Sequence, residues 1–249
     1  MSTSKSRHSD IAAFTPSQQA NRQTQHPIEQ TGSKTPQTHR FRSDSWLSTK
    51  DANFLLKKRA HWEASQENYS AAIQLLTRLI KFEPKAAEHY VNRGLMYSHA
   101  RQTDKALADY DQALEINPDF DRAYSNRANL YASQHSWAEA IADYDDAIDI
   151  NPLNVRARIN QAITFREMGH YEEALTCLDI ALFFHPESAC IYAERGRTYH
   201  LRGDWNCAIA DYNTALTLTE LPAPPDKTNQ LGNIATIQNR VKGWMNSLT

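Results

Sequence analysis

The chain has 249 residues, of which 22% are charged and 41% are hydrophobic, with 27 basic against 29 acidic side chains. A formal net charge of −2 and a pI of about 6.5 argue against general affinity for nucleic acid or for a membrane surface. No run of about eighteen apolar residues occurs, so the sequence predicts no membrane-spanning helix.

Residues 1–45 differ in composition from the rest of the chain. They are rich in Ser, Thr and Gln, and they carry six Lys or Arg against three acidic residues. Such a segment cannot bury enough apolar surface to offset its ordering entropy, so we expect a disordered N-terminal tail. It lacks the apolar core of a secretory signal. An organellar transit peptide would also be rich in Ser and Arg, but the acidic residues and the glutamines argue against one.

From residue 53 onward a pattern returns every 34 residues, and a proline closes it at Pro84, Pro118, Pro152 and Pro186. Each unit contains two apolar stripes at helical spacing, and the proline stops the second helix. A small residue in each first helix and an alanine early in each second helix predict a close crossing of the two. We predict five units, at 53–86, 87–120, 121–154, 155–188 and 189–222. The small residues are Ala60, Gly94, Ala128, Ala162 and Gly196, and the alanines are Ala72, Ala106, Ala140, Ala174 and Ala208.

This order of landmarks resembles the tetratricopeptide repeat (TPR). The residues that carry the resemblance in one unit are Tyr90, Gly94, Tyr97, Ala106, Tyr110, Ala113 and Pro118. The resemblance implies an all-α fold, a right-handed α-solenoid of five TPR helix hairpins whose first helices line a concave groove. The phrases NRGxxY and AIADYxxAIxINP are similar to those of bacterial repeat proteins, especially cyanobacterial or plastid ones, some of which assist assembly of photosynthetic complexes.

The fifth unit has Glu220 where the others have proline, and the stop is delayed to 221–225. Beyond it the sequence predicts a further helix at 226–249 with Asp226 as its N-cap. Its apolar stripe consists of Leu231, Ile234, Ile237, Val241, Trp244 and Leu248. We interpret it as a C-terminal capping helix that covers the last unit; the alternative is a docking helix for a partner.

An arginine in the first helix and an aspartate sixteen residues later recur in three units. In the fourth unit Gln161 and Cys177 replace both. This joint loss predicts an ion pair between the two helices of a unit. The pairs are Arg93 with Asp109, Arg127 with Asp143, and Arg195 with Asp211.

Charges are segregated in this arrangement: basic residues exceed acidic ones at the positions expected to face the groove, while the outer face is acidic. A row of asparagines at intervals of 34 residues could pair with the backbone of an extended peptide. The alternative is that asparagine is simply common at this position of the repeat. The candidate peptide-binding residues are Lys57, His61, Asn92, Arg122, Asn126, Arg156, Asn160 and Arg197.

Part of this set resembles the carboxylate clamp of co-chaperones, which requires Lys, Asn, Asn, Lys and Arg at intervals of 4, 31, 30 and 4. The chain has Lys57, His61, Asn92, Arg122 and Asn126 at those intervals. Arginine at 122 keeps the charge, but His61 and Asn126 depart from the pattern. Loss of the final cation weakens the expected grip on a terminal carboxylate.

No catalytic motif occurs, and the 7 glycines include no cluster that could hold a phosphate. Cys177, Cys190 and Cys207 lack metal-ligand spacing, which predicts reduced thiols in a cytoplasmic protein. We therefore predict no enzyme, no cofactor and no metal.

The predicted function is a monomeric protein-interaction scaffold or adaptor, with assembly factor as one form. It would bind an extended acidic or carboxylate-ended peptide segment of a partner in the groove. The alternative is a regulator that binds a signalling peptide or RNA through the groove and tail. Outward Ile180 and Phe183 are a second candidate interface.

Overall fold

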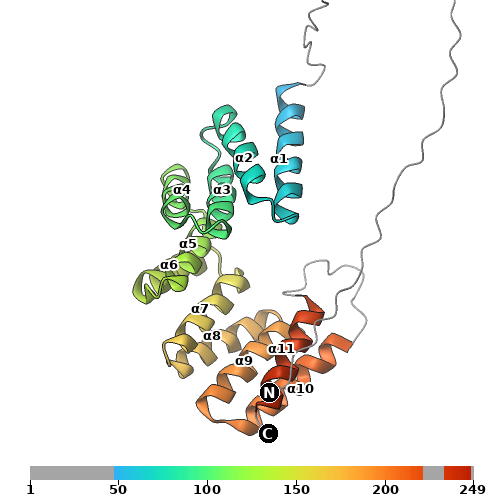
Figure 1. Ribbon diagram of the computed structural model, residues 1–249. Coiled ribbons are helices and arrows are strands. Elements are labelled where there is room, and N and C mark those ends of the chain that lie inside the picture. The colour runs from blue at the N-terminus through green and yellow to red at the C-terminus, as the bar shows by residue number, and fades with distance from the viewer. Residues whose placement is uncertain (1–47, 221–232, 248–249) are drawn as a thin grey trace, which may run out of the picture. The chain divides into compact units, whose positions relative to one another are not determined.

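The computed structural model describes residues 48–220 and 233–247, and over these two ranges the chain forms eleven α-helices and no strand (Figure 1). The first helices of successive pairs are α1 (Thr49–Ser65), α3 (Ala87–His99), α5 (Asp121–Ser133), α7 (Val155–Glu167) and α9 (Ala189–Arg202). The second helices are α2 (Tyr69–Phe82), α4 (Thr103–Ile116), α6 (Trp137–Ile150), α8 (Tyr171–Phe184) and α10 (Trp205–Glu220). The last helix is α11 (Ile234–Asn246). The expectations for the tail at 1–45 and for residues 221–225 fall outside the described residues.

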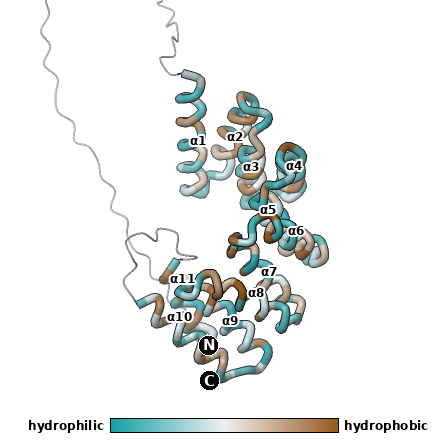
Figure 2. The backbone as a smooth tube through the Cα atoms, turned by 180° about the vertical axis from the view of Figure 1, so that it is seen from behind, coloured by the Kyte–Doolittle hydropathy of each residue, from teal (hydrophilic) through white to brown (hydrophobic). Residues whose placement is uncertain are grey.

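Each first helix packs against the second helix of its own pair, and from α3 onward also against the second helix of the preceding pair. Hydrophobic and hydrophilic residues alternate along the helices (Figure 2), so each helix has an apolar stripe to bury. The chain is thus an all-α solenoid of five helix hairpins with a C-terminal capping helix, which confirms the predicted fold class.

The two helices of a pair cross closely at the predicted small residues. A Cβ atom added to Gly94 would lie 2.8 Å from Cε1 of Tyr110 and 3.2 Å from the carbonyl oxygen of Ala106. Tyr110 is fully buried, as are its counterparts Tyr144 and Tyr212. The spacing of small and aromatic residues in the sequence therefore reflects one packing arrangement that is repeated along the solenoid.

The turn inside every pair contains one residue in the left-handed region, at the fifteenth position of the unit. Gly169 (φ 82°) and Gly203 (φ 98°) occupy it in the last two units, where glycine adopts this conformation without steric cost. In the first three units, non-glycine residues adopt φ values of 58° to 60°. They are Glu67, Arg101 and His135.

Helix α11 begins later than the sequence predicted. Asn233 has an extended backbone and accepts a hydrogen bond from the Ala235 amide through its side chain, so Asn233 and not Asp226 is the N-cap. Asp226, Leu231 and Leu248 lie outside the described residues. Ile237 and Val241 of α11 are buried in one cluster with Tyr212 of α10, whereas the outward positions of α11 are polar. A polar outer face is what the end of a repeat array requires.

A buried histidine links the first two pairs. His89 of α3 is 1% exposed, and its Nε2 lies 2.7 Å from a carboxylate oxygen of Glu83 in the preceding turn. The Glu83 carboxylate also accepts a hydrogen bond from Asn53 at 2.8 Å and pairs with Lys57 at 3.3 Å. These three contacts, that of His89 foremost, lower the pKa of Glu83 from 4.5 to about 2.

The low pKa of Glu83 predicts an acid-sensitive contribution to stability. A depressed pKa means that the contribution is complete above pH 4.5 and is lost as the pH falls toward about 2. The variant Glu83→Gln should therefore melt at a lower temperature than wild type at pH 7, and the gap should close between pH 4.5 and pH 2. Thermal melts followed by circular dichroism at several pH values measure this. The exposed Glu88→Gln is the matched control, and an equal gap at pH 7 and pH 2.5 would contradict the assignment.

Candidate interaction surface

The three predicted ion pairs between the helices of a unit are confirmed. Both carboxylate oxygens of Asp143 accept hydrogen bonds from Arg127, each at 2.8 Å. The equivalent bonds join Arg93 to Asp109 at 2.6 and 2.8 Å and Arg195 to Asp211 at 2.7 and 2.8 Å. The aspartates are buried, so these pairs are more enclosed than surface ion pairs.

The same arginines also contact the preceding unit. These contacts between units were not predicted from the sequence. Arg127 donates a second hydrogen bond to Asp111 of α4 at 2.6 Å, and Arg195 donates one to Asp179 of α8 at 2.7 Å. Asp143 raises the pKa of the Arg127 guanidinium against the opposing effect of burial, and Asp111 adds to the rise. The signal was present in the sequence, because each of these aspartates precedes its arginine by sixteen residues.

The fourth unit keeps these contacts, although a neutral glutamine and cysteine stand where the other units have arginine and aspartate. The Gln161 side chain donates a hydrogen bond to Asp145 of α6 at 2.6 Å, and the Cys177 thiol donates to the side-chain oxygen Oε1 of Gln161 at 3.5 Å. Burial raises the pKa of the Cys177 thiol to about 11, so the thiol stays protonated at neutral pH. Glutamine and cysteine therefore replace arginine and aspartate as a matched pair.

Most of the predicted binding residues lie on neighbouring first helices, which contact one another from α3 to α9. We call this surface the first-helix face; it comprises Asn92, Arg122, Asn126, Arg156, Asn160 and Arg197. Arg122 is exposed, and its Nη2 donates a hydrogen bond to the Asn92 side-chain oxygen at 3.3 Å, across the junction of α5 with α3. Within the described ranges, Arg156 is exposed without an ionic partner and Asn126 has no side-chain hydrogen bond.

The asparagine row does not present three equal amides. Asn160 donates a hydrogen bond to the Asn129 side-chain oxygen at 2.8 Å, and the Tyr144 hydroxyl donates to the same oxygen at 2.7 Å. Asn92 is held by Arg122 as described above. The three positions recur at the same spacing, but within the described residues only Asn126 has a side-chain amide that makes no hydrogen bond to the protein.

The residues proposed for a carboxylate clamp are only partly brought together. Asn92 and Arg122 are in contact. Lys57 is instead paired with Glu83 at 3.3 Å, and the exposed His61 makes no hydrogen bond or ion pair with the other clamp residues within the described ranges. A clamp needs all its cations directed at one carboxylate, so the structure gives the clamp hypothesis less support than the pair Arg122 and Arg156.

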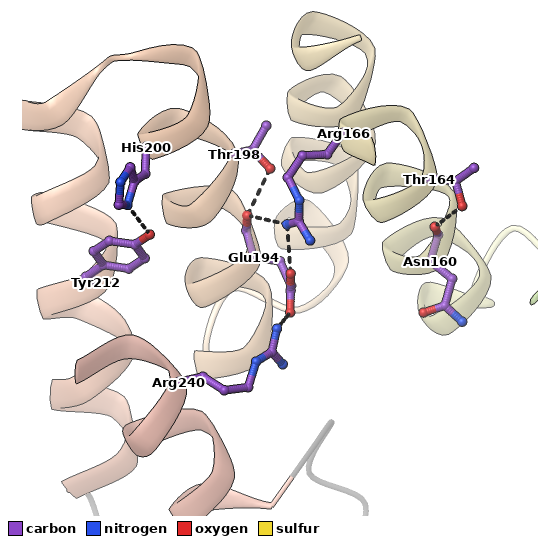
Figure 3. A network of polar contacts seen from close by, with 8 residues as sticks. All are labelled: Asn160, Thr164, Arg166, Glu194, Thr198, His200, Tyr212 and Arg240. Atoms are coloured by element: carbon purple, nitrogen blue, oxygen red, sulfur yellow. Dashed lines mark hydrogen bonds and ion pairs between the residues drawn. The ribbon is translucent and has the colours of Figure 1, made fainter. Parts of the chain in front are cut away.

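The C-terminal end of the first-helix face is occupied by the protein's own contacts (Figure 3). Glu194 of α9 lies between two arginines, with Arg166 of α7 on one oxygen at 2.8 Å and Arg240 of α11 on the other. Their positions in the repeat are ones expected to face the groove, but both side chains are buried and neutralise each other. They therefore contribute structural contacts and little free charge.

Arg197 is likewise engaged by the capping helix. Its guanidinium carbon lies 5.4 Å from the ring centroid of Trp244 in α11, and its Nη1 lies 3.5 Å from Nδ1 of His200. Burial, and then the charge of Arg197, lower the pKa of His200. Free positive charge on the first-helix face is thus concentrated at Arg122 and Arg156.

No group of His, Cys, Asp and Glu side chains in the described part of the chain could hold a metal ion. None of the helices that the structure describes is both long enough and apolar enough to cross a membrane.

Comparison with known proteins supports the repeat assignment. Tetratricopeptide-repeat family models match residues 87–120, 121–154 and 143–176. No curated protein sequence matches the chain. Among solved structures, a MamA fragment, from residue 41 to its end, from Desulfovibrio magneticus RS-1 has a TM-score of 0.58 at 14% identity and covers 68% of this chain and 96% of its own. Another MamA crystal structure has a TM-score of 0.56 at 16% identity and covers 71% of this chain and 100% of its own.

At these identities the structural matches establish the fold alone, and the family models identify the repeat. The 34-residue period, the buried tyrosines beside the small residues and the stacked helix pairs agree with both. The chain therefore contains tetratricopeptide repeats at residues 87–176.

Proposed function

We propose that the protein is an interaction scaffold or adaptor whose first-helix face binds an extended, acidic or carboxylate-ended segment of a partner protein. The observation that carries this proposal is the placement of Arg122 and Arg156. They occupy the same position of successive first helices, and both are exposed. The repeat fold supports the scaffold role, because arrays of this kind present an extended surface made from successive units.

Charge and backbone recognition would act on the same ligand strand. The side chain of Asn126, which is on the same helix as Arg122, offers a donor and an acceptor to a peptide backbone. The two arginines offer bidentate donors to carboxylates. An extended peptide that crosses from α5 to α7 would meet both kinds of group. We expect the scaffold to act as a monomer in the cytoplasm, and assembly of a larger complex is one role that such binding would serve.

The double change Arg122→Glu and Arg156→Glu should weaken peptide binding at least tenfold. Charge-assisted contacts of a partly shielded arginine contribute about 1.5–3 kcal/mol each, so losing two exceeds the 1.4 kcal/mol that corresponds to a factor of ten. A fluorescently labelled glutamate-rich peptide with a free carboxyl terminus, titrated by anisotropy, measures this. Binding should also weaken as salt rises.

The matched control is Arg78→Glu with Lys81→Glu. It makes the same change in net charge on α2, where both side chains are exposed and away from the first-helix face. Amidating the peptide's carboxyl terminus separates recognition of acidic side chains from recognition of the terminal carboxylate. If the double variant and the control bind the peptide as wild type does, the first-helix face is not the binding site. Single-stranded RNA that outcompetes the peptide would favour the regulator alternative.

A further inference from the structure

Every junction between successive units buries the same two positions of a first helix. The apolar residues at the third and tenth positions of units two to five share a hydrophobic cluster with the second helix of the preceding unit. Met96 lies in one cluster with Leu76 and Leu79 of α2, and Ile191 lies in one cluster with Leu178 and Leu182 of α8. All eight residues at these positions are buried. They are His89, Ala123, Ala157 and Ile191 at the third position, and Met96, Leu130, Thr164 and Thr198 at the tenth.

In α1 the side chains at the same two positions are exposed to solvent. Leu55, the third residue of unit one, is 51% exposed, and Trp62, the tenth, is 50% exposed. The seventh residue is Arg59, which corresponds to the junction arginines Arg93, Arg127 and Arg195. We call the surface formed by Leu55, Arg59 and Trp62 the α1 face. It has the residue types of an inter-unit junction, but no helix covers it among the described residues.

The interior junctions show what such a face binds. The seventh residue contacts an aspartate of the preceding second helix in three of the four junctions: Arg127 bonds Asp111, Gln161 bonds Asp145 and Arg195 bonds Asp179. Arg59 lies over the Trp62 ring, at 4.3 Å from its centroid, and pairs with Glu63 at 2.6 Å. Its side chain is still 59% exposed, so donors remain for an acidic group.

The charge around the α1 face indicates which kind of helix would bind there. Lys50 and Lys58 are exposed near the α1 face and add to the positive charge of Arg59, and together they outweigh the exposed Asp51. The protein's own residues 1–45 carry six basic against three acidic side chains, so they match this charge poorly. A second copy stacked end to end would offer α11, which has Arg240 and Lys242 and no acidic residue. Two α1 helices packed face to face would bring two copies of Arg59 together.

We propose that the α1 face is a docking surface for an acidic amphipathic helix of another protein, which takes the place of the second helix of a preceding unit. Its apolar residues would cover Leu55 and Trp62, and an acidic side chain between them would bond Arg59. The partner thus extends the solenoid by one helix. This surface is distinct from the first-helix face of the proposed function, and neither proposal depends on the other.

The second helices of the chain provide the probe. Residues 103–116, which form α4, carry Asp111 and pack their apolar side against the next first helix. A labelled peptide of this sequence, held helical by a hydrocarbon cross-link on its outer side, should bind the full chain in an anisotropy titration. Arg59→Glu and Trp62→Ala should each weaken binding at least tenfold, and the peptide with Asp111→Lys should not bind wild type. That peptide should bind Arg59→Glu instead, and this exchange of specificity also shows that the variant is folded.

Three results would overturn the proposal. The first is a probe that binds Arg59→Glu and Trp62→Ala as tightly as wild type. The second is at least tenfold tighter binding once residues 1–47 are removed, which would assign the α1 face to the chain's own tail. The third is a dimer in size-exclusion chromatography with light scattering that Trp62→Ala dissociates, which would assign the face to a second copy. The Arg122→Glu and Arg156→Glu variant should bind the probe as wild type does, which separates this surface from the first-helix face.

Discussion

Replacing Arg127 by alanine is expected to lower the free energy of unfolding by about 2–4 kcal/mol. The guanidinium bonds Asp143 within its own pair and Asp111 in the preceding pair, so the change cuts two contacts at once. It also leaves the Asp143 carboxylate buried without a counter-charge, because only 8% of that side chain is exposed. Urea denaturation followed by circular dichroism at 222 nm gives the free energy.

The matched control is Arg156→Ala, which also removes an arginine from a first helix. Arg156 is exposed and without an ionic partner in the described residues, so this change should stay within about 0.5 kcal/mol of wild type. Adding Asp143→Ala to Arg127→Ala should recover part of the loss, because the orphaned carboxylate is then gone. Equal unfolding midpoints for Arg127→Ala and Arg156→Ala would contradict a stabilising role for the bridge.

Removing residues 226–249 should destabilise the last pair and promote association. Ile237 is 5% exposed and Val241 is fully buried, and burial of such side chains contributes about 1.5–3 kcal/mol each. The truncated chain would expose Tyr212 and Ala215, which share a cluster with them, and would leave Glu194 without Arg240. We expect a melting temperature at least about 5 °C lower, together with oligomers in light scattering.

A point variant tests the same helix without shortening the chain. Val241→Asp places a carboxylate in the buried cluster and should cost about 3 kcal/mol or more. Lys242→Asp, one residue further on the exposed side of α11, is the control and should have little effect. A truncated protein that stays monomeric with an unchanged melting temperature would show that α11 is not a cap. The alternative of a partner-docking helix would then be preferred.

Much of the fold follows from the sequence by itself. The proline at every thirty-fourth residue and the small residues such as Gly94 and Ala106 predict both the helices and the way in which each pair crosses. The arginine and aspartate sixteen residues apart predict the bond inside a pair, and their joint replacement in unit four supports it. These features can be predicted from the sequence because they recur at the same position in successive units. The two helices cross in the same way in each unit, so the crossing requires the same residue type at the same position of each unit.

The tertiary structure decided the features that do not repeat. Arg166 and Glu194 look like free groove charges in the sequence, but they are buried as a pair because α11 brings Arg240 to the second oxygen of Glu194. The start of α11 at Asn233 and the exposure of Leu55 and Trp62 likewise depend on which neighbours are present at the two ends of the array. Periodicity specifies what a position contacts when a unit stands on either side. At an end one of those units is missing, so burial and charge pairing there depend on whatever else packs against the exposed helix.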